Sequence, residues 1–314
     1  MSFQTPLSFR PLFMERVWGG RLLAEMPGKG APAGEPIGES WEIVDRADAQ
    51  SVVARGPFIG TTLHELWTAF RKDVFGPHVP DSPRFPLLAK ILDAQDTLSV
   101  QVHPPASKAW ELGGEPKTEM WYLLDAAKGA ELFAGFRSGT TRVGFEHALE
   151  EGRVAELLHR VPVCAGDAMF IPSGRCHAIG AGCLIVEMQQ NSDTTYRVFD
   201  WNRKGLDGKP RALHIAESLA SIDFRDQEPA LAKPVGETIV SCPEFLAERW
   251  RLPEPRADES RDGVIFTVLS GGVKCAGEEF IRGQFFVLPA IARDRILTPT
   301  AADTSVLRTT IPPR

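Results

Sequence analysis

The most informative segment of the chain reads Gly166-Asp167-Ala168-Met169-Phe170-Ile171-Pro172-Ser173-Gly174-Arg175-Cys176-His177. Its apolar centre, residues 168–171, has the length of a short strand, and the glycine and proline on either side are typical turn residues. The second glycine starts a further turn that ends at one imidazole, that of His177. Short apolar runs bounded by glycine and proline are typical of all-β sandwiches and barrels. The segment therefore predicts a mainly β fold that presents a histidine where a strand begins or ends.

The composition of the whole chain agrees with a globular β protein. The 314 residues include 28 glycines and 25 prolines, which follow no repeat period. A hydrophobic share of 43% and a charged share of 24% exclude a disordered chain. The net charge of −6, without a basic block, argues against a nucleic-acid partner. No apolar run approaches the roughly 18 residues of a membrane span, so no membrane association is expected.

The cellular compartment is inferred from the N-terminus and the cysteines. The first 20 residues contain no apolar stretch of signal-peptide length. The cysteines number five, an odd count, and show no CxxC spacing. We therefore expect reduced thiols in a cytoplasmic protein.

The length predicts two structural units, since a domain averages about 150 residues. The polar, proline-containing stretch 225–235 is predicted to connect them. We accordingly divide the chain into a catalytic domain, residues 1–228, with a helical insertion, and a second, smaller β domain, residues 229–314. Apolar spacing over residues 145–161 predicts a helix interrupted at Gly152.

A weak internal repeat links these two units. The pattern Gly-x5-Pro at Gly166–Pro172 recurs at Gly283–Pro289, each time filled mostly with apolar residues. Because glycine and proline are abundant here, chance is an equally good explanation. The second copy lacks the polar residues of the first, so the second unit is expected to be metal-free.

A candidate metal site comes from four separate positions. Gln101 and His103 are two residues apart in the alternating run 98–103, so both side chains project from the same face of the predicted strand. Glu119 opens the next strand, and His177 ends the segment quoted first. Together they offer an amide oxygen, two imidazoles and a carboxylate, a suitable ligand set for a divalent metal with a free position. The spacing does not choose between zinc and non-haem iron.

Each of these residues alone has a simpler interpretation. A single histidine such as His103 is more often a hydrogen-bonded structural residue than a ligand, and Glu119 alone is more often a solvated strand-edge carboxylate. A Gln–His pair on one face is, however, expensive in a dry core unless partners are present. The combination with the Gly-Pro-Gly-His segment favours a metal site.

Three further residues are candidates for contacts with a substrate. Arg197 lies in the polar and aromatic stretch 191–203, which is either a surface loop or the wall of a pocket for an anionic group. Lys117 and Ser99 each precede a proposed ligand by two residues and therefore point to the same side. An ammonium and a hydroxyl beside a metal suit a phosphate or a polyol.

At these residues the chain resembles a known family. The segment 166–177 resembles the second signature of the cupin β-barrel, and Gln101-Val102-His103 with a late Glu119 resembles the modified first signature of type I phosphomannose isomerases, in their short bacterial form. The supporting strings follow the family order at residues 15–20, 37–42, 85–90, 98–104, 117–122 and 196–203. A weaker likeness continues towards the C-terminus.

The resemblance implies a cupin jelly-roll catalytic domain and a second cupin-like domain. It also implies an isomerase that interconverts mannose 6-phosphate and fructose 6-phosphate by zinc-assisted proton transfer through a cis-enediol(ate). Carried over residue by residue, it makes Gln101, His103, Glu119 and His177 the ligands of one Zn²⁺ per chain. It makes Arg197 the catalytic arginine that stabilises the enediolate.

The same resemblance assigns the contacts with a small sugar-phosphate substrate to Ser99, Lys117 and Trp18. A monomer or a weak homo-oligomer is expected. The chain departs from the family at Phe199, Trp201 and Asn202, which change the pocket wall without touching a ligand.

Several questions stay open on the sequence alone. The base that removes the carbon proton is either a zinc-activated water or a pocket carboxylate such as Glu187. Two other functions are compatible with the ligand set: an iron-dependent cupin dioxygenase, and a sugar-binding cupin without catalysis.

Overall fold

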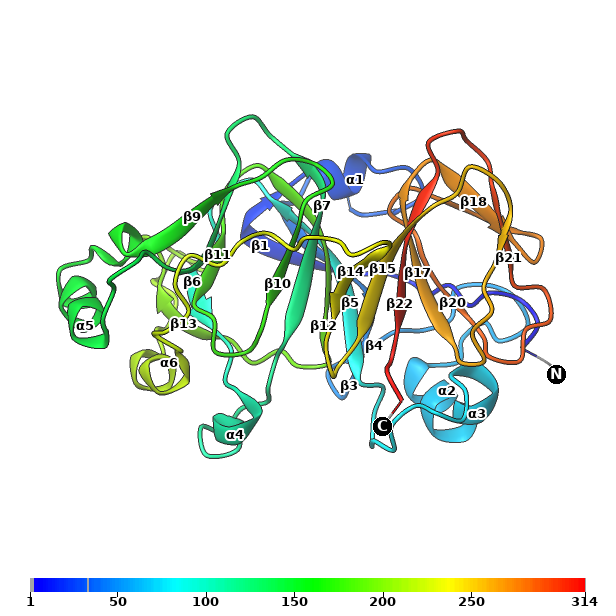
Figure 1. Ribbon diagram of the computed structural model, residues 1–314, viewed down its shortest axis with the longest axis horizontal. Coiled ribbons are helices and arrows are strands. Elements are labelled where there is room, and N and C mark those ends of the chain that lie inside the picture. The colour runs from blue at the N-terminus through cyan, green and yellow to red at the C-terminus, as the bar shows by residue number, and fades with distance from the viewer. Residues whose placement is uncertain (1–2, 33, 314) are drawn as a thin grey trace.

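Antiparallel strand pairing organises nearly the whole molecule, as expected for a mainly β cupin-type protein. The computed structural model describes residues 3–32 and 34–313. Figure 1 shows the strands β6 to β11 and β13 towards the left and β17 to β22 towards the right, and the two pairs of sheets meet near the middle of the view, where β5 appears next to β14 and β15. The strands are short because glycine and proline turns interrupt them.

The first pair of sheets surrounds the candidate site. One sheet has six strands in the order β1-β2-β5-β12-β7-β10, and the other has five in the order β13-β6-β11-β8-β9. The bounds in the six-stranded sheet are β1 Leu12–Gly20, β2 Ile37–Ile43, β5 Leu87–Ala94, β7 Glu119–Ala126, β10 Ala168–Ile171 and β12 Cys183–Gln190. The bounds in the five-stranded sheet are β6 Val100–Val102, β8 Glu131–Phe136, β9 Leu158–Pro162, β11 His177–Ile179 and β13 Tyr196–Phe199.

The second pair of sheets lies in the C-terminal part of the chain. Its sheets have the orders β14-β15-β22-β17-β20 and β16-β21-β18-β19. The first consists of β14 Thr238–Ser241, β15 Leu246–Arg251, β17 Val264–Ser270, β20 Phe285–Leu288 and β22 Ser305–Thr310. The second consists of β16 Arg256–Ala257, β18 Gly272–Cys275, β19 Glu278–Ile281 and β21 Ile296–Pro299. A small hairpin in the N-terminal part pairs β3 Asp45–Arg46 with β4 Ala49–Gln50.

The helices are short and lie outside the sheets (Figure 1). They are α1 Leu22–Glu25, α2 Leu63–Ala69, α3 Arg71–Val74, α4 Ala106–Ala109, α5 Arg142–Glu150, α6 Ile215–Ser221 and the 3₁₀ turn η1 Val154–Glu156. Helix α2 begins with a capping box: Thr62 accepts from the backbone N–H of Glu65, whose carboxylate accepts from the backbone N–H of Thr62. No helix in the described part of the chain is long and apolar enough to cross a membrane.

The helix expected over residues 145–161 is wrong beyond residue 150. Helix α5 ends at Glu150, and Gly152 adopts a left-handed conformation with φ of 69°. After η1, residues 158–162 form β9, in which Val161 pairs with Leu132 of β8. The apolar spacing of this region fits either a continuous helix or a turn followed by a strand. The strand forms because it pairs with β8 at the edge of the sheet.

The C-terminal pair of sheets has an apolar cluster of its own, and another apolar cluster connects the two pairs of sheets. One cluster lies within the C-terminal sheets and includes Trp250, Phe266 and Phe286. The largest cluster takes residues from both parts, for example Leu87 from β5 and Leu307 from β22. The division at residues 228 and 229 stays a prediction, and it now has to account for this shared core.

The repeat seen in the sequence corresponds to a structural repeat. Gly166 and Gly283 both have positive φ, of 92° and 83°. Each is followed after one residue by a four-residue strand, β10 or β20. The turn that a left-handed glycine permits therefore starts an equivalent edge strand in both pairs of sheets.

All five cysteines are free thiols. Cys176 lies in the apolar cluster that contains Val100 and Val102, on the side away from its neighbour His177. Burial raises the pKa of the Cys176 thiol above its usual range, which keeps it protonated and unreactive.

Candidate metal centre

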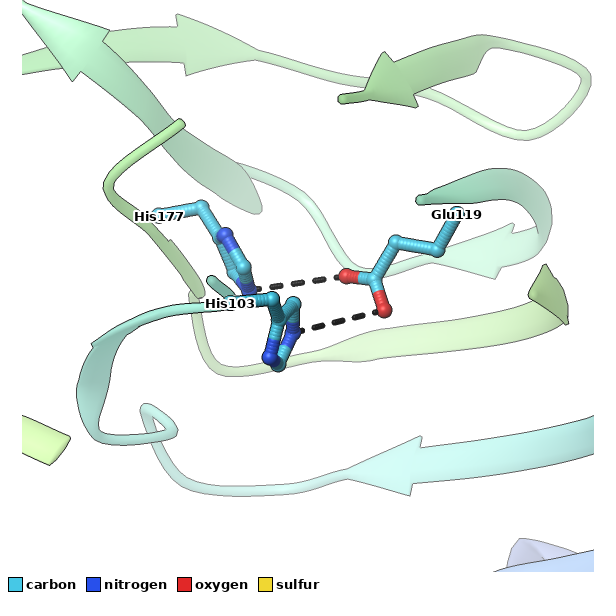
Figure 2. Close-up of side chains that lie close together, drawn as sticks. All are labelled: His103, Glu119 and His177. Atoms are coloured by element: carbon cyan, nitrogen blue, oxygen red, sulfur yellow. Dashed lines mark ion pairs between the residues drawn. The ribbon is translucent and has the colours of Figure 1, made fainter. Parts of the chain in front are cut away.

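Three of the four expected metal ligands meet at one point between the two N-terminal sheets. His103 directly follows β6, Glu119 starts β7 and His177 starts β11. The ligand atoms that these three residues offer all lie within 4.8 Å of one another (Figure 2). The His103 Nε2 is 3.5 Å from Glu119 Oε2, and the His177 Nε2 is 3.4 Å from Glu119 Oε1. No other such cluster of histidine, cysteine and acidic residues occurs in the described residues.

Backbone contacts orient both imidazole rings towards the carboxylate. The Nδ1 of His103 is 2.8 Å from the carbonyl oxygen of Thr194, and the Nδ1 of His177 is 2.9 Å from that of Arg175. A carbonyl can only accept, so each Nδ1 carries the proton and each Nε2 presents a lone pair. Gly174 makes the turn before His177, with φ of 95°, and its N–H donates to the carbonyl oxygen of His103.

The ligand atoms fit a cation because the two imidazole nitrogens have no donor to accept from. His103 Nε2 and His177 Nε2 are buried and accept no hydrogen bond, whereas Glu119 Oε2 has an ion pair with Lys117 Nζ at 3.0 Å. Unpaired buried polar atoms are costly, and a divalent metal would satisfy both imidazoles while it binds the carboxylate. The chemistry of the donors and their convergence thus fit a metal ion.

The ionisation of the three residues also suits metal binding. Burial lowers the pKa of His177 to about 3, and burial together with Lys117 lowers the pKa of His103. Both rings are therefore neutral near pH 7, the form that binds metals. Burial alone would raise the pKa of Glu119, but Lys117 and His103 outweigh it and hold that pKa well below its usual range.

Gln101 lies beside this group. It pairs with His177 of β11 on one side and with Arg197 of β13 on the other. Its side chain lines the same cavity. The sheet register thus places Gln101 beside two residues that are 76 and 96 positions away in the sequence.

A cavity of about 590 Å³ opens beside the three ligands. Five residues singled out from the sequence line it: Trp18, Ser99, Gln101, Lys117 and Arg197. It is also lined by residues that sequence reasoning did not assign, namely Arg16, Glu39, Lys90, Leu206, Asp207 and Arg211.

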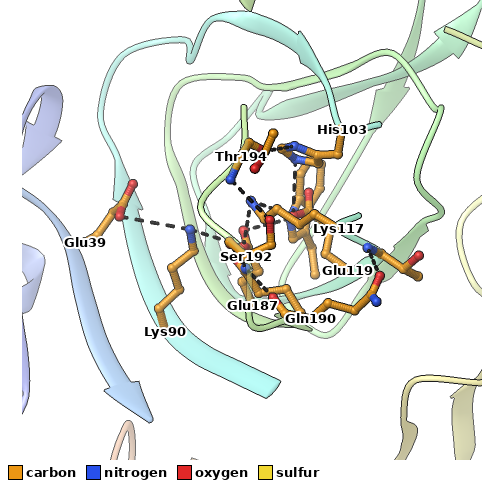
Figure 3. Close-up of polar contacts among 12 residues, drawn as sticks. Glu39, Lys90, His103, Lys117, Glu119, Glu187, Gln190, Ser192 and Thr194 are labelled. Atoms are coloured by element: carbon orange, nitrogen blue, oxygen red, sulfur yellow. Dashed lines mark hydrogen bonds and ion pairs between the residues drawn. The ribbon is translucent and has the colours of Figure 1, made fainter. Parts of the chain in front are cut away.

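A chain of alternating charges connects the cavity wall to the metal ligands (Figure 3). Lys90 Nζ lies 3.2 Å from Glu187 Oε1 and 4.0 Å from Glu39 Oε2. Lys117 Nζ lies 3.7 Å from the same Glu187 oxygen and 3.0 Å from Glu119 Oε2. These side chains are nearly fully buried, so each charge depends on its neighbours for compensation.

The sheet register explains why these charges meet. Lys90 on β5 is directly opposite Glu187 on β12, and Glu187 is directly opposite Trp121 on β7. The indole Nε1 of Trp121 donates to Glu187 Oε2 at 3.0 Å. A single lysine within the apolar run 87–92 was the sequence signal for this role, because a buried lysine requires an anionic partner.

Burial raises the pKa of Glu187, and the charge of Glu119 raises it further, while Lys90 and Lys117 oppose the rise. For Lys90, burial alone would lower the pKa, but Glu187 and Glu39 outweigh it and hold the ammonium charged. The cavity therefore contains a carboxylate whose proton affinity is above normal, fixed between two ammonium groups.

Comparison with known proteins identifies the family of this chain. The model of the phosphomannose isomerase type I catalytic domain matches residues 7–133. The mannose-6-phosphate isomerase ManA of Bacillus subtilis (strain 168) is 38% identical over 298 residues, which are 90% of this chain and 93% of that protein. A mannose-6-phosphate isomerase of Streptococcus mutans serotype c is 39% identical over 276 residues, 85% of each chain. This chain belongs to the type I phosphomannose isomerase family.

Solved structures agree with this membership. The mannose 6-phosphate isomerase from Bacillus subtilis superimposes with a TM-score of 0.87 at 31% identity, over 98% of this chain and 100% of that one. A mannose 6-phosphate isomerase bound with zinc and yttrium shares the fold, with a TM-score of 0.73 at 17% identity over 97% of this chain and 99% of that one. The resemblance drawn from the sequence is confirmed.

The remaining histidines of this family member lie outside the metal cluster. His64 contacts Asp45, and His78 contacts Asp262. His147 is on α5. His159, which falls in the range 145–161 predicted to be helical, lies within β9 instead.

Proposed function

We propose that the chain is a mannose-6-phosphate isomerase that holds one zinc ion per chain at Gln101, His103, Glu119 and His177. The observation that carries the proposal is the buried His–Glu–His group, whose imidazole Nε2 atoms have no hydrogen-bond partner, beside a cavity lined by cationic and acidic side chains, in a member of this family. Zinc is favoured because two neutral imidazoles and a carboxylate are common zinc donors. When bound, the ion would supply Lewis-acid polarisation of the sugar's oxygen atoms.

Isomerisation moves one proton between C2 and C1 through a cis-enediol(ate), so a base must accept the carbon proton. We assign this role to Glu187, which lines the cavity and has a pKa raised by burial. A general base works best when its pKa approaches the working pH. Trp121 and Lys90 hold the carboxylate in place, and its Oε1 accepts no hydrogen bond.

Arg197 is proposed to stabilise the negative charge of the enediolate. Its NH1 donates to the carbonyl oxygen of Ala212 at 2.8 Å, while its buried Nε has no partner. Further guanidinium donors are therefore free to serve a ligand. A guanidinium stays protonated while it donates, which suits an oxyanion.

Ser99, Lys117 and Trp18 are proposed as substrate contacts. Ser99 precedes β6 and lies two residues from Gln101, so a hydroxyl stands near the metal ligands. The ammonium of Lys117 is shared with Glu119 and Glu187, which places a positive charge beside the reacting end of the sugar. Trp18 contributes an apolar wall for the sugar ring.

The test is a coupled assay in which fructose 6-phosphate appears from mannose 6-phosphate, run before and after chelation, with metal analysis of the purified protein. We expect turnover that chelation abolishes and zinc restores. Oxygen uptake by an iron-containing protein would instead support a cupin dioxygenase. Binding of the sugar phosphate without turnover by the metal-replete protein would support a sugar-binding cupin.

We further propose that the protein acts in the cytoplasm as a monomer or a weak homo-oligomer. Free thiols at all five cysteines support a reducing compartment. Fractionation of cells and sedimentation of the purified protein over a concentration series test the two statements.

A further inference from the structure

Most cations around the cavity are paired with carboxylates. At the end near the metal ligands, Arg16, Lys90 and Lys117 are matched by Glu39, Glu187 and Glu119. Each cation there already has an anionic partner. A substrate phosphate that docked at this end would therefore have to compete with buried carboxylates.

A second group of charges lies in the segment between β13 and α6 (Figure 1), where Arg203 and Arg211 both pair with the buried carboxylate of Asp200. Of these two arginines, Arg211 lines the cavity. Arg203 also reaches Asp96, a side chain that is 64% exposed and thus compensates weakly. Asp207 lines the cavity as well, but its described contact is with the backbone N–H of Lys209 rather than with these arginines.

The geometry around Asp200 fixes Arg211 but leaves part of it free. Its Nε and NH2 donate to the two oxygens of Asp200 at 2.7 and 2.5 Å, a bidentate pair. Arg203 donates NH2 to the same carboxylate and NH1 to Asp96 and the carbonyl oxygen of Thr97. Arg211 lines the cavity with its NH1 edge uncommitted, whereas Arg203 is used for holding the loop.

The backbone between β13 and α6 has a tight turn that brings Arg211 to Asp200. Trp201 and Asn202 both have φ of 54°, a left-handed conformation that costs energy in residues other than glycine. The turn is anchored by the indole of Trp201, which donates to the carbonyl oxygen of Leu98 at 2.7 Å. As a result the chain returns after residue 203, and Arg211 meets Asp200 at the cavity wall.

We infer that Arg211 binds the phosphate group of the substrate and that Asp200 is the positioning residue that holds its guanidinium. This inference rests on the proposed function and adds a residue to it. The uncommitted NH1 edge of Arg211 can donate to a phosphate oxygen, and the positive charge of the guanidinium attracts the dianion.

The experiment compares Arg211→Ala and Arg211→Lys with Lys209→Ala, measuring kcat and KM for mannose 6-phosphate and the inhibition constant of inorganic phosphate. Lys209 is an exposed cation of the same loop that does not line the cavity, so its variant controls for loss of charge alone. For Arg211→Ala we expect KM and the phosphate inhibition constant to rise about 10- to 100-fold, with kcat changed less than about threefold. Arg211→Lys should be intermediate, because lysine keeps the charge but loses the bidentate geometry.

Asp200→Asn tests the positioning role. It should raise KM in the same direction while zinc content and kcat hold, whereas a merely structural role would lower the melting temperature and leave KM unchanged. Unaltered KM and phosphate inhibition in a folded Arg211→Ala protein would overturn the inference. If the wild type does not isomerise, the proposed function fails, and calorimetric binding of mannose 6-phosphate to wild type and Arg211→Ala still decides the inference.

Discussion

Replacing Lys90 by methionine tests the charge arrangement of the cavity most directly. The two side chains have similar length, so the substitution removes a charge with little change in volume. Lys90 Nζ lies 3.2 Å from Glu187 Oε1 in a nearly dry site. At an effective dielectric constant of about 20, two unit charges at that separation attract by about 5 kcal/mol.

This attraction sets the direction of the effect. Its loss raises the pKa of Glu187, because Lys90 favours the charged form of the carboxylate. Lys117, at 3.7 Å, and water entering the vacated space make the rise smaller than the full attraction would give. A base must be deprotonated to act, so activity rises with pH through its pKa. The acid limb of kcat/KM should therefore move to higher pH, and activity lost at pH 7 should return at alkaline pH.

The assay is a pH profile of kcat/KM with metal content determined for each variant. Lys90→Arg, which keeps the charge, should leave the acid limb near that of the wild type. Lys128→Met, which removes an exposed lysine outside the cavity, should change nothing. An acid limb that stays in place in a zinc-loaded Lys90→Met protein would refute the assignment of Glu187 as the base that Lys90 controls.

Three further outcomes are expected. Chelation should lower the melting temperature of the wild type by about 4 °C, if the free ion had been at about 100 times its Kd; differential scanning calorimetry should find no such response in His177→Ala. Arg197→Ala should lower kcat about 10²- to 10³-fold with full zinc occupancy, and an unchanged kcat would remove its catalytic role. Asp258→Asn should lower the free energy of unfolding by about 3–5 kcal/mol, measured with urea, because two partly buried arginines lose the charge of a fully buried carboxylate. Burial alone would raise the pKa of Asp258, but Arg308 and Arg295 outweigh it and lower that pKa in the folded protein. The stabilisation from these ion pairs is therefore complete above about pH 4 and is lost as the pH falls through the folded-state pKa. In that range the variant and the wild type should approach the same free energy of unfolding.

The fold and the metal group were largely predictable because they depend on local patterns. Left-handed glycines and prolines delimit the strands at fixed spacing, and this chemistry is read directly from segments such as 166–177. Alternation places Gln101 and His103 by a rule that involves only neighbouring residues. The helical pattern of 145–161 failed where the local signal suited two structures equally.

The charges around the cavity were not predictable in the same way. That Lys90 faces Glu187 follows from the register between β5 and β12, which is set by the packing of the whole sheet. Asp200 pairs with both Arg203 and Arg211, but Arg203 also pairs with Asp96. Only the tertiary structure therefore shows that Arg211 is the arginine with a free edge at the cavity.

The sequence by itself determined which chemical groups this protein possesses and the turns that begin and end its strands, because both follow from residue type and short-range geometry. Only the tertiary structure decided which of those groups share a cavity, which charges neutralise one another and which remain free for a ligand. The physical reason is that pairing of distant strands, and the burial that comes with it, sets the electrostatic energy of each side chain, and no local pattern contains that information.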